Sequence, residues 1–80
     1  MGICYLLLTC AGNKNIETAD IIRKLPGVEE AIPVTGAYDC IVKTEMISDD
    51  VKNFVLSSIR PLDNVRSVLT LYDAPPLLLS

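Results

Sequence analysis

Val34-Thr35-Gly36-Ala37-Tyr38-Asp39 is the most informative stretch of this 80-residue chain. It places a glycine-containing reversal between two strand-like runs, residues 28–35 and 38–45, and sets a hydroxyl, an aromatic ring and a carboxylate beside it. Glycine adopts the backbone angles of tight turns without steric cost, so this stretch predicts the connection of a long hairpin. A turn of this composition is also equipped to hold a small ligand.

The runs before the hairpin supply a strand and a helix. Residues 3–10 form a short, continuous apolar run, which predicts a central strand covered on both faces. Asn15 can cap a helix over residues 15–25 that ends at Pro26-Gly27. The apolar positions of this helix are Ile16, Ala19, Ile21, Ile22 and Leu25. Pro33 cannot donate a ladder hydrogen bond, which predicts that the strand over residues 28–35 lies at a sheet edge.

The second half of the chain repeats this plan. The Ser48 hydroxyl can cap a second helix, whose first turn carries two carboxylates and which Pro61 ends. Its buried stripe is predicted to be Val51, Phe54, Val55 and Ile59. Residues 65–72 predict the last strand, and residues 73–80 form a proline- and leucine-containing tail that either docks on a neighbour or frays.

The resulting order, strand-helix-strand-strand-helix-strand, predicts an α+β, ferredoxin-like fold. In this arrangement a four-stranded antiparallel sheet carries two helices on one face. One offset superimposes Ile22 on Ile59 and Val28 on Val65, a faint trace of internal duplication. Because apolar residues populate both sides of the central strands, we expect dimerisation through the other sheet face.

Composition indicates self-association without nucleic-acid binding. Half of the residues are apolar (50%), yet a chain of this size buries only about 60% of the surface that its unfolded form exposes. A surplus of apolar surface therefore favours an oligomer. The net charge is −3 and the seven basic residues are scattered, so no positive stripe is available to bind phosphates directly.

Three cysteines, Cys4, Cys10 and Cys40, lie in apolar surroundings. Their odd number, and a chain start without the features of a secretory signal, favour the cytoplasm. Cys4 and Cys40 would approach one another if their strands were neighbours, and the expectation is that both are small buried hydrophobic residues. The apolar run near the start is far too short to span a membrane.

Little in the sequence points to catalysis. The chain has no histidine, which excludes a Ser/His or Cys/His nucleophile pair and any metal site that needs imidazole. It also lacks a Cys-x-x-Cys pair and a phosphate-binding loop, so neither a metal nor a cofactor is expected. The turn has a purely structural interpretation as well, in which Gly36 supplies a positive φ, Asp39 accepts hydrogen bonds from nearby backbone N–H groups and Tyr38 packs across the hairpin.

Four segments carry a family resemblance: Leu25-Pro26-Gly27-Val28, Val34 to Asp39, Ile41-Val42-Lys43 and Val65-Arg66-Ser67-Val68-Leu69-Thr70. In this order and spacing they resemble the effector-binding domain of the Lrp/AsnC family of feast/famine regulators, also called the regulation-of-amino-acid-metabolism (RAM) domain. The match covers roughly residues 3–72. Family regulators carry an N-terminal helix-turn-helix domain, whereas this chain begins with the first strand. Residues 1–80 therefore resemble a stand-alone form of the domain.

The resemblance implies sheet-on-sheet dimers that assemble into a ring, an octamer or a decamer, with amino-acid effectors bound between dimers near the turn. Carried over by position, Thr35, Gly36, Tyr38 and Asp39 would line the site together with Thr70. Backbone N–H groups at the turn would hold the ligand carboxylate, Asp39 its ammonium group, and Tyr38 its side chain. Many members have a hydroxyl residue where this chain has Val68, which implies a preference for a more apolar ligand.

These expectations describe an amino-acid-sensing, oligomerising module that acts on transcription through a partner, such as a full-length Lrp/AsnC regulator, without binding DNA itself. Two alternatives share the order of elements. A small dimeric α+β barrel enzyme would have to rely on Tyr5, Tyr38, Asp39 or Arg66 without a histidine base. An ACT-like amino-acid-binding domain would place its ligand glycine in the first strand-helix loop, at Gly12.

Overall fold

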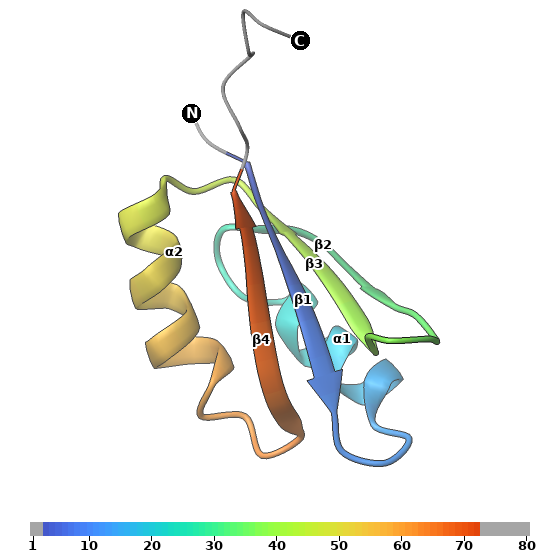
Figure 1. Ribbon diagram of the computed structural model, residues 1–80. Coiled ribbons are helices and arrows are strands. Elements are labelled where there is room, and N and C mark those ends of the chain that lie inside the picture. Colours follow the sequence, from blue (N-terminus) through green and yellow to red (C-terminus); the bar gives the residue numbers. More distant parts are fainter. Residues whose placement is uncertain (1–2, 73–80) are drawn as a thin grey trace, which may run out of the picture.

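The computed structural model describes residues 3–72 of the chain (Figure 1). The tail over residues 73–80, for which docking or fraying was expected, lies outside the described residues. The elements follow the predicted order: β1 (Cys4–Cys10), α1 (Asn15–Arg23), β2 (Val28–Pro33), β3 (Cys40–Thr44), α2 (Ser48–Phe54), a π-helical continuation η1 (Val55–Ile59) and β4 (Val65–Tyr72). The predicted bounds are confirmed for the last strand, whereas the first helix and both hairpin strands are shorter than expected.

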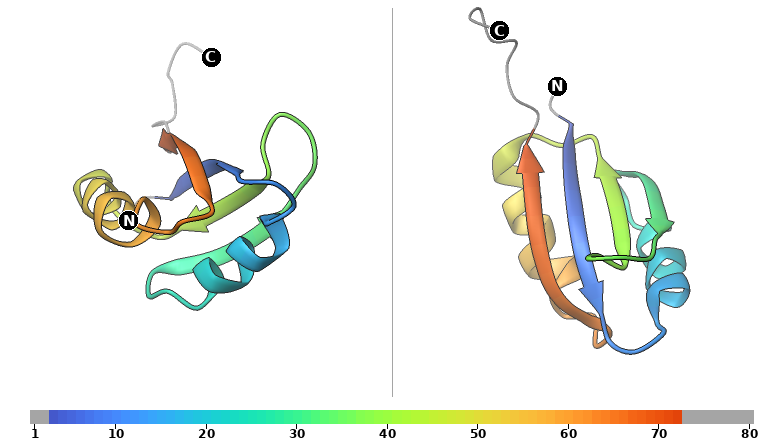
Figure 2. Two further views of the ribbon diagram at one scale, coloured as in Figure 1. Left: turned by 90° about the horizontal axis from the view of Figure 1, so that it is seen from below. Right: turned by 45° about the vertical axis from the view of Figure 1, so that its right-hand side comes forward.

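The four strands form one antiparallel sheet in the order β2-β3-β1-β4. β1 is central, as its continuous apolar run predicts, and β2 is an edge strand, as Pro33 predicts. Within the chain β1 is covered on one face alone, because its alternate residues are half-buried or exposed, so the expected cover on both faces is wrong for the single chain. Both helices cover the same face of the sheet (Figure 2). The α+β, ferredoxin-like fold is thereby confirmed.

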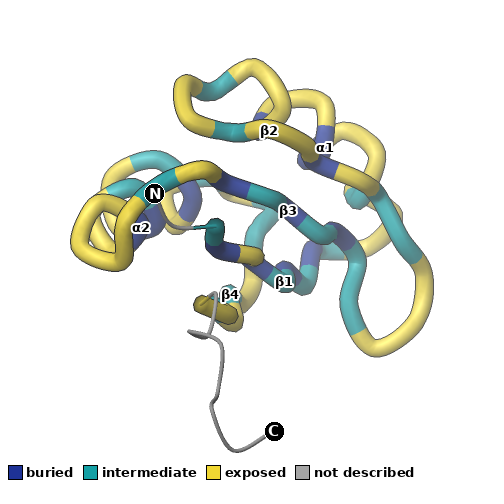
Figure 3. Tube along the Cα trace, turned by 90° about the horizontal axis from the view of Figure 1, so that it is seen from above, coloured by how far each residue is buried: buried dark blue, intermediate teal, exposed yellow. Residues whose placement is uncertain are grey.

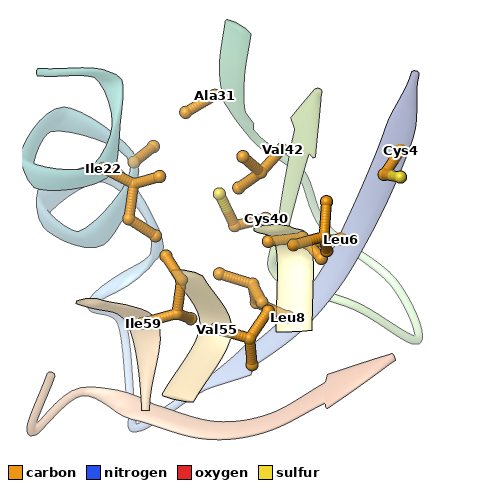
Figure 4. Close-up of a cluster of buried hydrophobic side chains, with 11 residues drawn as sticks. Cys4, Leu6, Leu8, Ile22, Ala31, Cys40, Val42, Val55 and Ile59 are labelled. Carbon is orange, nitrogen blue, oxygen red and sulfur yellow. The ribbon is translucent and has the colours of Figure 1, made fainter. Parts of the chain in front are cut away.

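The hydrophobic core lies between the sheet and the helices. Burial alternates along β1 and β3, and Figure 3 shows buried positions interleaved with half-buried and exposed ones on these strands. Figure 4 shows Leu6 and Leu8 of β1 grouped with Cys40 and Val42 of β3, and with Ile59 of η1. Cys4, Ala19, Ile22, Ala31, Val51 and Val55 complete the buried cluster.

The first helix differs from its prediction at both ends. Lys14, not Asn15, is the N-cap residue, and it makes no side-chain capping hydrogen bond. The helix ends at Arg23, and Ile16 and Ile21 are exposed at 62% and 45% because they lie on the face that points away from the sheet. Thr18 is buried in their place, beside Ala19. The polar Thr18 is the position that helical spacing of apolar residues did not reveal.

The second helix also begins without the predicted cap. Ile47 is the N-cap residue of α2, and the Ser48 hydroxyl makes no capping bond. The two carboxylates of the first turn still oppose the positive end of the helix dipole. In η1 the Arg60 N–H donates to the Val55 carbonyl at 2.8 Å, five residues back, which is the π-helical pattern. The predicted buried stripe is confirmed, with three residues buried and Phe54 partly buried against the core.

The connection between α1 and β2 packs closely against the end of β3. Gly27 has a φ of 87°, and a side chain there would collide with Cε of Met46. The Glu45 N–H donates to the Gly27 carbonyl at 3.2 Å. The positive φ favours glycine here, whereas a Cβ would only require the flexible end of the Met46 side chain to move.

Among residues 3–72, no helix is both long enough and apolar enough to cross a membrane.

Candidate functional site

The turn between β2 and β3 stands out at one end of the hairpin (Figure 2). Its two ends are joined by a hydrogen bond from the Val34 N–H to the Asp39 carbonyl at 2.9 Å. Residues 35–37, here called the turn tip, are exposed, whereas Tyr38 and Asp39 are half-buried. Gly36 has a φ of 135°, and beyond Gly36 and its two chain neighbours no described atom lies within 4 Å of the place where its Cβ would be. The tip thus presents open backbone to a ligand.

Asp39 anchors the turn to the central strand. Its N–H donates to the Leu8 carbonyl at 2.8 Å, and its Oδ2 accepts a hydrogen bond from the Cys10 N–H at 2.7 Å. Regular pairing of β1 with β3 ends at Leu8 and Cys40, so the carboxylate supplies the acceptor that the β3 backbone would otherwise provide. This is the structural role that the sequence allowed for Asp39. No further hydrogen bond to the carboxylate is found within residues 3–72, which leaves Oδ1 for a ligand.

Asn15 connects the other end of the turn to α1. Its Nδ2 donates to the Val34 carbonyl at 3.2 Å, and its Oδ1 accepts a hydrogen bond from the Ile16 N–H at 3.0 Å. Sequence reasoning identified Asn15 as a helix cap and missed its contact with the turn. The contact spans 19 residues of sequence and depends on the packing of α1 against β2, for which no local signal exists.

Buried thiols lie near the anchored end of the turn. Cys4 pairs with Thr44, whereas Cys40 pairs with Leu8, so the expected approach of Cys4 to Cys40 is wrong. Cys10 is the cysteine that shares the neighbourhood of Cys40, two residues beyond Leu8 on the same face of β1. The Cys4 thiol instead donates to the Met46 carbonyl at 3.6 Å.

Both thiols near the turn are poor nucleophiles. Burial raises the pKa of Cys40 to about 11, and the neighbouring Cys10 and Asp39 add to the rise, whereas Arg23 acts in the opposite direction. Burial also raises the pKa of Cys10; the Thr18 hydroxyl opposes this effect and the Asp39 carboxylate adds to it. A thiol must ionise to attack an electrophile or to bind a metal, so at neutral pH these cysteines serve as hydrophobic residues.

The structure does not bring Thr70 to the turn. Thr70 pairs with Leu6 on the opposite side of β1 from β3, and it shares with Leu6 the sheet face that the helices cover. Within one chain, the predicted set of site residues is therefore reduced to Thr35, Gly36, Tyr38 and Asp39. Val68 pairs with Leu8 and packs against the core, so it does not line the turn either. Strand register decides these positions, and register follows from which face of β4 is covered.

The second notable surface is the sheet face that no helix covers. We call this surface the outer sheet face. Its apolar residues are Tyr5, Leu7, Ile32, Ile41, Leu69 and Leu71. Leu69 and Leu71 are each 45% exposed. At one end of this face the hydroxyls of Thr9 and Ser67 share a hydrogen bond of 2.6 Å, and at the other end Lys43 pairs with Glu29 at 3.6 Å. An apolar centre between polar ends is the usual anatomy of a protein–protein interface.

No metal centre is evident in the described part of the chain. Within residues 3–72, no three Cys, Asp or Glu side chains are grouped so that they could hold a metal ion.

Solved structures with the same fold include regulators. FFRP-DM1 is 29% identical, with a TM-score of 0.84 over 92% of this chain and 100% of that chain. AsnC of E. coli is 21% identical, with a TM-score of 0.81 over 96% of this chain and 54% of that chain. The transcriptional regulator NMB0573 of Neisseria meningitidis, solved as a complex with L-Met, is 17% identical, with a TM-score of 0.77 over 92% of this chain and 50% of that chain.

One group of curated relatives is enzymatic. The homocitrate synthase of Sulfurisphaera tokodaii is 33% identical in an alignment of 67 residues, and the match covers 80% of this chain and 15% of the enzyme. The chain therefore spans about 15% of the length of this relative. No family model matches the chain.

Proposed function

Because the chain shares its fold with Lrp/AsnC-type regulators, we propose that it is an amino-acid-sensing, oligomerising module that modulates transcription through a partner regulator and binds no DNA itself. The observation that carries the proposal is the exposed turn tip, whose two ends are fixed by Asp39 and Asn15. A rigidly supported loop with open backbone suits a small zwitterion, because little conformational entropy is lost when the ligand binds.

The ligand chemistry follows from the groups at the turn. The N–H groups of Thr35 and Gly36 would hold the carboxylate of an amino acid, Oδ1 of Asp39 its ammonium group, and Tyr38 would pack on its side chain. Hydrogen bonds to charged groups contribute about 1.5–3 kcal/mol each, so two or three of them suffice for binding in the micromolar to millimolar range. The L-Met complex of the N. meningitidis regulator supports an amino acid as the ligand class. Thr70 would enter the site only from a neighbouring copy.

The outer sheet face would bury itself against a second copy in a sheet-on-sheet dimer. Its apolar centre supports this assembly, because an exposed apolar patch of this kind usually marks an interaction surface. Dimers would then form a ring, an octamer or a decamer, with the turn tip between adjacent dimers. The module would work in the cytoplasm beside a full-length Lrp/AsnC regulator, and its net charge of −3 is consistent with DNA contact through that partner alone.

Native mass spectrometry of the 80-residue chain tests the proposal. The wild type, Asp39→Asn and the charge-matched control Asp63→Ala are compared across the twenty amino acids. Asp63 is exposed in the loop before β4, and its carboxylate makes no hydrogen bond within residues 3–72. A ring of dimers that gains the mass of one amino acid in the wild type and the control, but not in Asp39→Asn, supports the proposal.

Two results contradict it. An assembly indifferent to all twenty amino acids removes the sensing role and leaves a purely architectural subunit. Tight, salt-sensitive binding of DNA by the pure chain removes the dependence on a partner, since such binding reports contacts to phosphates.

A second candidate function follows from the homocitrate synthase relatives. Identity to a part of that enzyme, 33%, exceeds the identity to E. coli AsnC, 21%. The same module could thus report amino-acid levels to a biosynthetic enzyme. Mixing the chain separately with a full-length Lrp/AsnC regulator and with homocitrate synthase distinguishes the two functions. Mixed assemblies with the regulator alone favour transcription, and an amino-acid-dependent change in synthase activity favours the enzyme.

A further inference from the structure

The turn tip is attached to the molecule at two points. At the end of the turn that leads into β3, Asp39 donates its N–H to β1 and accepts a hydrogen bond from β1 at its Oδ2. At the end that follows β2, the Val34 N–H donates to the Asp39 carbonyl, and the Val34 carbonyl accepts a hydrogen bond from Nδ2 of Asn15. Both backbone polar groups of Val34 are therefore occupied, one within the turn and one by α1.

At Gly36 the space around the missing Cβ is open: among the described residues other than its two chain neighbours, no atom lies within 4 Å. The conformation of residues 35–37 therefore depends chiefly on where the two ends of the turn are held. Asn15 is well placed to hold the first end, because the helix turn that carries it is immobilised by the burial of Thr18 and Ala19, which are 1% and 0% exposed.

We infer that Asn15 is a positioning residue of the effector site: its side-chain amide holds the turn tip against α1 in the geometry that binds the ligand. The ligand part of this inference rests on the proposed function, whereas the positioning part concerns the free protein alone. Asn15 does not touch the ligand. It lowers the entropy lost on binding by restricting the tip beforehand, and it ties the tip to the first turn of α1.

Two substitutions separate this role from helix capping. Asn15→Asp keeps an oxygen that can accept from the Ile16 N–H, and a carboxylate is favourable at a helix start, but it cannot donate to the Val34 carbonyl. Asn15→Ala removes both contacts. Asn13→Ala is the matched control, because Asn13 is exposed in the preceding loop and makes no hydrogen bond within residues 3–72.

Amide hydrogen exchange followed by NMR on the full chain is the test in the absence of ligand. Asn15→Asp is expected to speed exchange at the Val34 amide up to about tenfold relative to Asn13→Ala, the scale of one hydrogen bond, and by clearly more than in β1, while the urea midpoint falls no further than the loss of one hydrogen bond explains. Asn15→Ala should give the same local effect together with faster exchange at the start of α1. Unchanged exchange at Val34 in Asn15→Asp, or a uniform increase over the whole chain, overturns the positioning role.

Calorimetric titration with the amino acid that the panel identifies completes the test. The dissociation constant should rise about threefold to tenfold in Asn15→Asp and stay unchanged in Asn13→Ala, with the same ring size in both. An unchanged dissociation constant in Asn15→Asp overturns the inference for the site. If the wild type binds none of the twenty amino acids, the proposed function fails, and the exchange result still decides whether Asn15 positions the turn.

Discussion

Removing the Asp39 carboxylate should destabilise the protein measurably, before any ligand is considered. Its Oδ2 accepts a part-buried hydrogen bond of 2.7 Å from the Cys10 N–H, at the point where β1 and β3 stop pairing. Hydrogen bonds to charged groups contribute about 1.5–3 kcal/mol, and Asp39→Ala also leaves that N–H without its acceptor, so a loss of about 2 kcal/mol is expected. Asp39→Asn keeps a neutral acceptor and should lose about 1 kcal/mol.

Urea unfolding of the wild type, Asp39→Ala and Asp39→Asn measures these losses of stability. Domains of this size change their melting temperature by roughly 4–8 °C per kcal/mol, so Asp39→Ala should also melt about 8–16 °C lower. The protein concentration must be equal throughout, because association raises apparent stability. Asp63→Ala controls for the change in net charge and should stay within about 0.5 kcal/mol of the wild type.

Equal stability of Asp39→Ala and Asp63→Ala would contradict this prediction, since the bond to Cys10 would then contribute nothing. A larger loss in Asp39→Asn than in Asp39→Ala would also refute it, because the amide retains an acceptor that the methyl group lacks. If Asp39→Asn loses less stability than Asp39→Ala, it is the better variant for ligand tests. It removes the charge that would pair with an ammonium group but keeps an acceptor for the Cys10 N–H.

Three further predictions concern the outer sheet face, the buried thiol and the glycine before β2. Leu69→Lys should raise the dissociation constant of the proposed dimer at least tenfold in sedimentation experiments, because a leucine that becomes buried on association contributes about 1.5–3 kcal/mol. Leu56→Lys, on the exposed side of η1, should leave that dissociation constant unchanged. Cys40 has a folded-state pKa of about 11 against an ordinary 9.0, so its contribution to stability is complete below pH 9 and is lost as the pH rises toward 11. The loss should amount to at most about 2–3 kcal/mol in urea unfolding, and Cys40→Ala should lack this part of the pH dependence. Gly27→Ala should cost roughly 1–2 kcal/mol in the same assay through left-handed backbone strain, because the flexible end of Met46 can move away from the added Cβ. Met46→Ala in the same chain should therefore not restore the lost stability.

The order of elements and the sheet edge could be predicted because single residues determine them locally. Pro33 lacks an N–H group and therefore excludes β2 from the sheet centre, and the continuous apolar run of β1 is typical of a covered strand. The turn at Gly36 was predictable for the same reason. The composition of residues 34–39 favours a chain reversal regardless of how the rest of the chain packs.

Features that depend on tertiary packing could not be predicted in this way. Whether Asn15 caps α1 or reaches the turn depends on the backbone angles of the preceding residue and on the position of β2. The face on which Thr70 lies follows from pairing with Leu6, and a shift of one residue would reverse it. The π-helical geometry of η1 arises in a stretch without proline or glycine and has no sequence signal of its own.

The central strand takes part in both surfaces discussed above. Alternate side chains of β1, among them Leu7, lie on the outer sheet face, while the Leu8 carbonyl and the Cys10 N–H hold Asp39. If the chain forms the proposed dimer, β1 would connect the turn to the dimer interface. Any coupling free energy between ligand binding and association would then be reciprocal by linkage. An amino acid that favours assembly must then bind more tightly to the assembled form, and its saturation curve should become steeper as the protein concentration falls toward the dissociation constant of the assembly.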